Sequence, residues 1–324
     1  MGRYLNPGME SFEKSVNSEI YVDKTGLVGY TNRVMNTVQG YVCVSRPRRF
    51  GKSMAANMLT AYYSRGCDSR EIFSKFEISE SLDFEKYRNK YNTIFLNMQE
   101  FLSRSDSVEA LVDRVKKLVL RDLKREYPDV DYFDDTDLVE SMQDIYETEK
   151  CPFVVIIDEW DCIFREFRQN KEAQEKYLDF LRDLLKDKAC IHLAYMTGIL
   201  PIKKYGTHSA LNMFDEFSMI NPGPLAPYVG FTEVEVEYLC HKYRMDMEEV
   251  KAWYDGYSFS MAASVYSPRS VVNSMLFGKI ENYWNQTETF EALQVYIDMN
   301  FDSLKDDVLS MIAGERIPVN TGSF

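Results

Sequence analysis

The feature that most constrains this chain is the segment of residues 45–53, which has the sequence SRPRRFGKS. An apolar, β-branched run at residues 41–44 precedes it, and a helix-forming run at residues 54–59 follows it. A tight loop between a strand and a helix, ending in Gly-Lys-Ser, is the arrangement of a phosphate-binding loop. Backbone N–H groups at the start of such a helix point at phosphate oxygens, and the helix dipole favours their negative charge. The segment therefore predicts a nucleotide site.

Residues of this loop have distinct expected roles. Gly51 lets the backbone approach the phosphates because it has no Cβ. Lys52 is expected to reach the β- and γ-phosphates, and Ser53 to place its hydroxyl on Mg²⁺. The usual motif, G-x-x-x-x-G-K-[ST], has a glycine where this chain has Arg46, which adopts positive φ less readily. The residues predicted to bind nucleotide are Arg46, Pro47, Arg48, Arg49, Phe50, Gly51, Lys52, Ser53 and Met54.

Arg46, Arg48 and Arg49 fall within four positions of one another and give the loop a local positive charge. Two interpretations are open for them. They face phosphates or a partner subunit, as arginine fingers do, or they are solvated charges of a surface loop.

A second motif lies about a hundred residues further along the chain, where the apolar run 153–157 ends in Asp158 and Glu159. A continuous apolar run is typical of a strand buried on both faces, as in a parallel sheet. Ligands of open α/β sheets bind at the carboxyl ends of the strands. Asp158 is therefore expected to hold Mg²⁺, and Glu159 to polarise the attacking water as a general base. The alternative is an ordinary buried strand followed by a solvated acidic loop.

Two more strand-like runs complete the predicted sheet, at residues 91–97 and 191–198. The second run ends in Thr197, which we expect to contact the γ-phosphate or the attacking water; the alternative is a threonine that closes a strand before a turn. Amphipathic helices are predicted between the strands, with apolar residues on one face, at residues 105–127, 136–147 and 170–187. Strands that alternate with amphipathic helices predict a doubly wound α/β fold with a mostly parallel sheet.

A proline-rich connector at residues 221–227 divides the chain. We expect a domain at residues 1–220 with an N-terminal lead-in, and a smaller, mainly α-helical domain at residues 228–324. Thr232 and Glu235 have the spacing of a capping box at the start of a helix. The aromatic motifs of the second domain, at residues 253–257 and 282–284, are expected to be core and turn features rather than a ligand site.

The amino-acid composition argues against several classes of ligand and location for this chain. A net charge of −13 argues against broad nucleic-acid binding by this chain. The six cysteines form no C-x-x-C pair, and the histidines are scattered, so we expect a reduced, cytoplasmic protein without a disulfide framework or a zinc site. The chain has no apolar run of about eighteen residues or more, so we expect no membrane span.

With these motifs in order, the chain resembles the AAA-ATPase-like family of bacterial and archaeal proteins. The matching stretches lie at residues 21–25, 45–53, 157–161, 197–199, 230–232, 253–257, 265–268 and 282–284. The resemblance implies a P-loop NTPase fold of three αβα layers, with ATP and Mg²⁺ as ligands. It assigns Lys52 and Ser53 to phosphates and Mg²⁺, and Asp158 and Glu159 to the Walker B site. An arginine at the first-glycine position is typical of this family. Asp23 and Lys24 are signature residues of the family, expected to fold over the nucleotide or to cap the sheet edge.

The chain departs from the family pattern in two places. Trp160 stands where members commonly have tyrosine, which changes little. Many members carry a nuclease-like domain of the PD-(D/E)XK type after the ATPase region, whereas this chain ends at Phe324. We therefore expect the helical domain to be truncated, and we assign no nuclease activity to the chain.

Three functions remain as hypotheses. The first is an ATPase whose nucleotide state switches the helical domain between two arrangements. The second is a regulatory scaffold that retains ATP, hydrolyses it slowly and controls a protein partner or a nuclease. The third, a factor that acts directly on nucleic acid, is opposed by the acidic composition. A homo-oligomer is compatible with the first two hypotheses, although the sequence shows no convincing arginine finger that acts in trans.

Overall fold

The computed structural model describes residues 2–202, 211–219, 221–259 and 262–283. The chain divides into two compact units, Met1–Gly230 and Phe231–Phe324. The sequence predicts the division a few residues earlier, between 220 and 228. Each unit is built around a sheet of its own.

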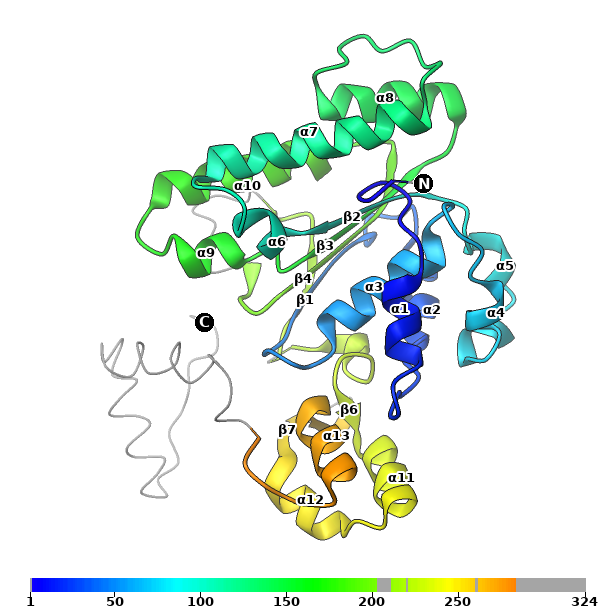
Figure 1. Ribbon diagram of the computed structural model, residues 1–324, viewed down its shortest axis with the longest axis vertical. Coiled ribbons are helices and arrows are strands. Elements are labelled where there is room, and N and C mark those ends of the chain that lie inside the picture. The colour runs from blue at the N-terminus through cyan, green and yellow to red at the C-terminus, as the bar shows by residue number, and fades with distance from the viewer. Residues whose placement is uncertain (1, 203–210, 220, 260–261, 284–324) are drawn as a thin grey trace. The chain divides into compact units, whose positions relative to one another are not determined.

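The first unit contains a parallel sheet whose described strands follow the order β2-β3-β4-β1-β5 (Figure 1). The strands are β1 (Tyr41–Ser45), β2 (Asn92–Asn97), β3 (Phe153–Asp158), β4 (Ile191–Gly198) and β5 (Asp215–Phe217). The four runs predicted as strands correspond to β1 to β4, and β4 lies between β1 and β3. Every residue of β3 is buried, which explains its uninterrupted apolar run before Asp158.

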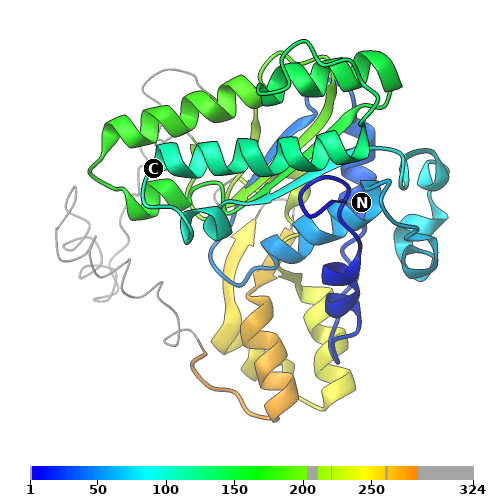
Figure 2. The same cartoon turned by 45° about the horizontal axis from the view of Figure 1, so that its top comes forward.

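Helices cover both faces of this sheet, as the two views in Figures 1 and 2 show. α3 packs against β2, β3 and β4 on one face, with α1 and α2 beside it. α7, α8 and α10 lie together on the other face. The helices of the two faces are α1 (Glu10–Val16), α2 (Gly26–Val34), α3 (Lys52–Tyr63), α6 (Met98–Leu102), α7 (Val108–Glu126), α8 (Leu138–Glu149), α9 (Cys162–Glu166) and α10 (Lys171–Leu185). These three layers are those of the predicted fold class.

α7 illustrates how the sequence produces the layer. Leu111, Val115 and Val119 recur at four-residue intervals and are fully buried, so one face of the helix packs into the core. The hydroxyl of Ser107 accepts a hydrogen bond from the Ala110 N–H at 3.2 Å and caps the first turn. α7 therefore begins and ends close to the predicted limits of 105 and 127.

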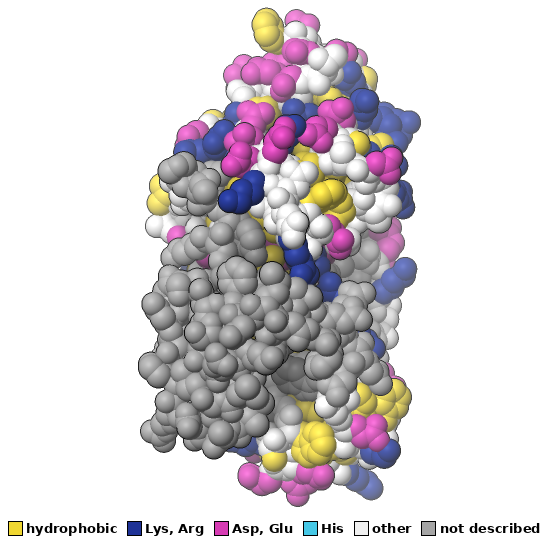
Figure 3. Space-filling view, turned by 90° about the vertical axis from the view of Figure 1, so that its left-hand side faces the viewer, with side chains coloured by type: hydrophobic (Ala, Val, Ile, Leu, Met, Phe, Trp, Pro, Cys, Tyr) yellow, Lys and Arg dark blue, Asp and Glu magenta, His cyan; other side chains and the backbone are white. Residues whose placement is uncertain are grey.

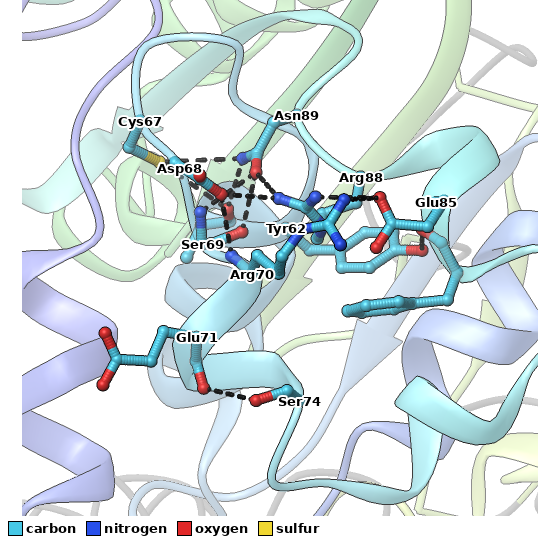
Figure 4. Close-up of polar contacts among 12 residues, drawn as sticks. Tyr62, Cys67, Asp68, Ser69, Arg70, Glu71, Ser74, Glu85, Arg88 and Asn89 are labelled. Carbon is cyan, nitrogen blue, oxygen red and sulfur yellow. Dashed lines mark hydrogen bonds and ion pairs between the residues drawn. The ribbon is translucent and has the colours of Figure 1, made fainter.

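Short helical turns, α4 (Arg70–Phe73), η1 (Glu77–Glu80) and α5 (Phe84–Tyr87), flank the far end of α3. A polar network links α4 and α5 to this end of α3 (Figure 4). The buried Arg88 guanidinium donates to Asp68 at 2.8 Å and to Glu85 at 2.9 Å. The Asn89 amide donates to the Ala61 and Ser64 carbonyls at the end of α3, at 3.1 and 2.7 Å. The network satisfies carbonyls at the end of the helix that begins at the phosphate-binding loop.

The second unit combines helices with a small antiparallel sheet of order β6-β8-β7. Its elements are β6 (Phe231–Thr232), α11 (Glu233–Tyr243), α12 (Met247–Tyr254), β7 (Asp255–Phe259), β8 (Ala262–Tyr266) and α13 (Pro268–Phe277), and the turn η3 (Gly223–Leu225) precedes the unit. The predicted capping box is present: Thr232 accepts from the Glu235 N–H, and Glu235 accepts from the Thr232 N–H. The sequence analysis did not predict this sheet. Trp284 and the rest of the predicted helical domain lie outside the described residues.

The structure also bears on the expectations about disulfides and membrane-spanning helices. All six cysteines are free thiols. Among the helices of the described residues, none combines the length and apolar character that crossing a bilayer requires.

Candidate functional site

The predicted phosphate-binding loop connects β1 to α3. β1 ends at Ser45 and α3 begins at Lys52, so the loop has the strand and helix that the motif needs. Gly51 lies in the left-handed region with φ of 89°, and a Cβ placed there would meet nothing within 4 Å. Arg49 is also left-handed, with φ of 69°. The glycine therefore satisfies a backbone requirement and leaves the start of α3 open.

Lys52 is buried at this helix start, with only 4% of its surface exposed. Its Nζ donates to the Pro47 carbonyl across the loop at 3.0 Å. Burial lowers the pKa of Lys52, and the nearby Glu159 and Asp158 carboxylates act in the opposite direction. The loop and the acidic end of β3 therefore lie close enough for their charges to influence one another.

Arg46 is 1% exposed, which the motif did not predict for a charged loop residue. Its Nη1 donates to the Ser45 carbonyl at 3.0 Å and to the Phe217 carbonyl of β5 at 2.7 Å. Among the described residues, its Nε and Nη2 have no hydrogen-bond partner. Burial lowers the pKa of Arg46 to about 10, against the opposing influence of Tyr195. The side chain therefore joins β1 to β5 beneath the loop and is neither solvated nor on the surface.

The other predicted nucleotide-binding residues differ in exposure. Ser53 and Met54 are exposed in the first turn of α3, Pro47 and Arg48 are half-buried, and Arg49 is exposed. The Phe50 ring is buried in the protein. The hydroxyl of Ser53 is thus accessible to a ligand.

The acidic side of the site begins at Asp158, the last residue of β3, which is almost fully buried. The Thr197 hydroxyl, near the end of the neighbouring β4, donates to Asp158 Oδ1. The Asn97 amide, at the end of β2, donates to Asp158 Oδ2 at 3.5 Å. Three adjacent strands therefore place polar side chains at one edge of the sheet, and Thr197 lies beside the predicted Mg²⁺ ligand.

Glu159 follows Asp158 with φ of 56°, a conformation that costs energy in a residue with a Cβ. Its carboxylate forms an ion pair with the Arg165 guanidinium of α9. Burial raises the pKa of Glu159, and the positive charges of Arg165 and Lys52 oppose this effect. The predicted base is thus held by a cation of its own chain.

Asp161 joins the acidic loop to the segment after β4. Its side chain is fully buried, and Oδ2 accepts from the Ile199 and Leu200 N–H groups at 3.0 and 2.9 Å. Arg165 Nε lies 3.5 Å from the same oxygen. A Cβ at Gly198 would lie 2.6 Å from Trp160 Nε1, so this close packing requires glycine.

The sequence analysis did not identify Arg165, Asn97 or Asp161 as site residues. The position of Asn97 at the end of a strand is a signal of the same kind as that of Thr197. Arg165 lies four residues after Asp161, the spacing of a helical ion pair. The ion pair with Glu159 depends on how α9 folds back over the loop, which the sequence pattern does not show.

Asp23 and Lys24 form hydrogen bonds that join neighbouring segments of the first unit. Asp23 accepts from the Thr25 N–H at 2.8 Å and the Glu77 N–H at 2.9 Å. Lys24 Nζ donates to the Pro227 carbonyl at 2.7 Å. The pair therefore links the start of α2 to η1 and to the proline-rich connector.

The donors present fit a magnesium nucleotide. Among the described residues, no three His, Cys, Asp or Glu side chains gather as a self-sufficient metal site. Mg²⁺ is usually bound through one or two protein oxygens together with phosphates and water. Asp158 and the exposed Ser53 hydroxyl match that donor set, and the buried Lys52 supplies positive charge near Asp158.

Comparisons with known proteins identify the family of the chain. A family model described as "Predicted AAA-ATPase" matches residues 6–207. An uncharacterized protein in the vnfD 5′ region of Azotobacter chroococcum mcd 1 is 25% identical over 298 residues, which are 87% of this chain and 54% of that protein. This chain therefore spans about half the length of that relative.

Two solved structures resemble this chain with low structural similarity and low sequence identity. The replication initiator DnaA, bound to AMPPCP and single-stranded DNA, has a TM-score of 0.38 and 9% identity, with 96% of this chain and 77% of that chain covered. The ORC2 protein of Aeropyrum pernix, in ADPNP and ADP complexes, has a TM-score of 0.35 and 11% identity, with 69% and 54% covered. Such scores are too low to support a functional comparison. The family match covers more than half of the chain, and this protein belongs to the AAA-ATPase-like family.

Proposed function

We propose that this protein binds ATP with Mg²⁺ at the edge formed by β1, β3 and β4, and hydrolyses it. The observation that carries the proposal is the placement of a buried lysine at the start of α3, electrostatically coupled to Asp158 and Glu159 at the end of β3. An ATPase needs this pairing of a phosphate-binding cation with carboxylates.

The loop side would bind the phosphates. The N–H groups at the start of α3 and the Lys52 ammonium would contact phosphate oxygens, and Gly51 leaves room for their approach. A bound Mg²⁺, held by Ser53 and Asp158, would neutralise charge that develops on the phosphates. Glu159 would accept a proton from the attacking water, and Thr197 would keep Asp158 oriented.

Thermal unfolding of the wild type and of Lys52→Ala, each with and without Mg-ATP, tests the proposed binding. At about a hundred times its dissociation constant, the nucleotide should stabilise the wild type by roughly 2.7 kcal/mol. We expect this increase to be absent in Lys52→Ala. A matched control is Lys171→Ala, because Lys171 is also the first residue of a helix but is exposed. A wild type that Mg-ATP does not stabilise would contradict the proposal.

The ion pair between Glu159 and Arg165 favours a second candidate, a regulatory scaffold that retains ATP and hydrolyses it slowly. In this arrangement the base is engaged by Arg165, so turnover would be low until a partner displaces the arginine. Arg165→Ala should then raise the rate of phosphate release several-fold without tightening nucleotide binding. Arg168→Ala is the control, because Arg168 lies just beyond the same helix and is exposed. Equal or lower turnover in Arg165→Ala would contradict this second candidate.

The proposed ATPase function leads to further proposals about conformational change, binding partners and location. We propose that nucleotide state alters the second unit, and that the partner is a protein or a second copy of the chain. The net charge of −13 supports the expectation that nucleic acid is not a ligand of this chain. On the described part of the face in Figure 3, acidic side chains gather toward the top with basic ones between them. The six free thiols support a cytoplasmic location.

A further inference from the structure

The second unit has the connectivity of a helix-turn-helix module with a β-hairpin beside it. β6 pairs with β8, and β8 pairs with β7 to form the hairpin. α11 and α12 lie between β6 and β7 and are joined by the three residues 244–246. Arg244 adopts φ of 57° at the end of α11, which turns the chain sharply. A short turn between two helices is a feature of this motif.

In proteins that use this motif to bind DNA, the second helix lies in the major groove. The equivalent helix here is α12. Val250 and Tyr254 are its buried residues, and they pack into the second unit. The outward face consists of Glu248, Glu249, Ala252 and Trp253, all exposed. Because residues four apart lie on successive turns of one face, the two carboxylates adjoin the alanine and the tryptophan.

The charge of this face does not suit nucleic acid. Two carboxylates stand where a DNA-binding helix presents groups to phosphates and bases, and they repel phosphates. Residues 233–254 contain six Asp and Glu residues and three Lys and Arg residues. One of those lysines, Lys251, forms an ion pair with Glu233 of α11. The face therefore attracts cations, and it also offers an aromatic surface, because Trp253 is 51% exposed.

We propose that α12 is a docking helix for a protein segment that carries arginine next to an apolar side chain. A guanidinium can bind a carboxylate with two parallel hydrogen bonds and can stack on an indole ring. Glu248 or Glu249 supplies the carboxylate and Trp253 supplies the ring. The neighbouring Ala252 leaves space for the apolar side chain. This inference concerns the second unit and does not depend on the proposed ATPase activity.

Fluorescence anisotropy with the full chain tests this inference. The probe is a short fluorescein-labelled peptide with two Arg-Leu pairs, and a labelled DNA duplex is measured in parallel. We expect the peptide to bind the wild type and the duplex not to bind. Replacing both carboxylates with glutamine, Glu248→Gln with Glu249→Gln, should weaken peptide binding about tenfold, and Trp253→Ala should weaken it by a similar factor.

The matched control is Glu172→Gln with Glu175→Gln, which makes the same change of charge on an exposed part of α10. It should leave peptide affinity within about twofold of the wild type. An equal loss in this control would mean that the peptide senses only net charge, and would overturn the inference. Unchanged binding in the α12 variants, no peptide binding to the wild type, or tighter binding of the duplex than of the peptide would overturn it as well.

Discussion

The two sides of the proposed nucleotide site, the loop around Lys52 and the carboxylates that follow β3, are stabilised by different contacts. On the carboxylate side, each acidic side chain has a partner within the protein. Thr197 donates a hydrogen bond to Asp158, Arg165 forms an ion pair with Glu159, and two backbone N–H groups donate to Asp161. On the loop side, Lys52 is buried and Arg46 retains two nitrogens that lack a partner among the described residues.

This difference indicates which side depends on ligand. A buried cation without a paired carboxylate is costly, and an anionic ligand relieves that cost. The carboxylate side is organised by the fold itself. Substitutions there should therefore impair stability or turnover, whereas substitutions on the loop side should impair nucleotide binding.

The largest expected effect is that of Glu159→Gln on turnover. Removing a general base typically lowers the rate of the chemical step by about 10² to 10⁴-fold. Nucleotide affinity should change little, because the carboxylate is not expected to contact phosphates. Phosphate release and equilibrium nucleotide binding measure the two properties separately. Turnover equal to that of the wild type would show that Glu159 is not the base.

Asp161→Ala should produce the largest loss of stability on the carboxylate side. The substitution leaves the Ile199 and Leu200 N–H groups without their acceptor and leaves Arg165 without one of its carboxylates. Breaking a buried arrangement of this kind costs roughly 3–5 kcal/mol. Urea unfolding of the ligand-free protein measures the change, and Asp179→Ala, at an exposed aspartate of α10, is the control. Similar losses in both variants would contradict a special role for Asp161.

Thr197→Val should have an intermediate effect. Valine keeps the shape of threonine but cannot donate to Asp158, so one hydrogen bond to a buried carboxylate is lost. Such a bond contributes about 1.5–3 kcal/mol, and part of this is retained because Asn97 and the Glu159 N–H still donate to Asp158. Thr197→Ser keeps the hydroxyl and should recover most of the stability in the same unfolding experiment. Failure of serine to do so would mean that the methyl group, not the hydroxyl, matters.

Much of the first unit could be predicted from sequence, because its signals are local. The strand, loop and helix around Lys52 and the apolar run before Asp158 each specify an element within a few residues. The antiparallel sheet of the second unit was missed because β6 has only two residues, and because residues 253–257, which overlap β7, were interpreted as an aromatic motif. The burial of Arg46 depends on a contact between β1 and β5, which are distant in the sequence. The Glu159–Arg165 ion pair joins residues only six apart, but it depends on the conformation of the turn between β3 and α9. Periodicity carries no information about such contacts.

The smallest expected effect is the change in ligand-free stability caused by Lys52→Met, and it is the most direct test of the difference between the two sides. Methionine has a similar length and no charge, so it removes an ammonium whose pKa is lowered by burial and loses one hydrogen bond to Pro47. The two effects oppose each other, and the net change should stay within about 1 kcal/mol. Urea unfolding without nucleotide measures this change, and the stabilisation by Mg-ATP should disappear in the same variant. If Lys52→Met lost as much ligand-free stability as Asp161→Ala, Lys52 would stabilise the fold to the same extent as the carboxylates do. The proposed difference between the two sides of the site would then be wrong.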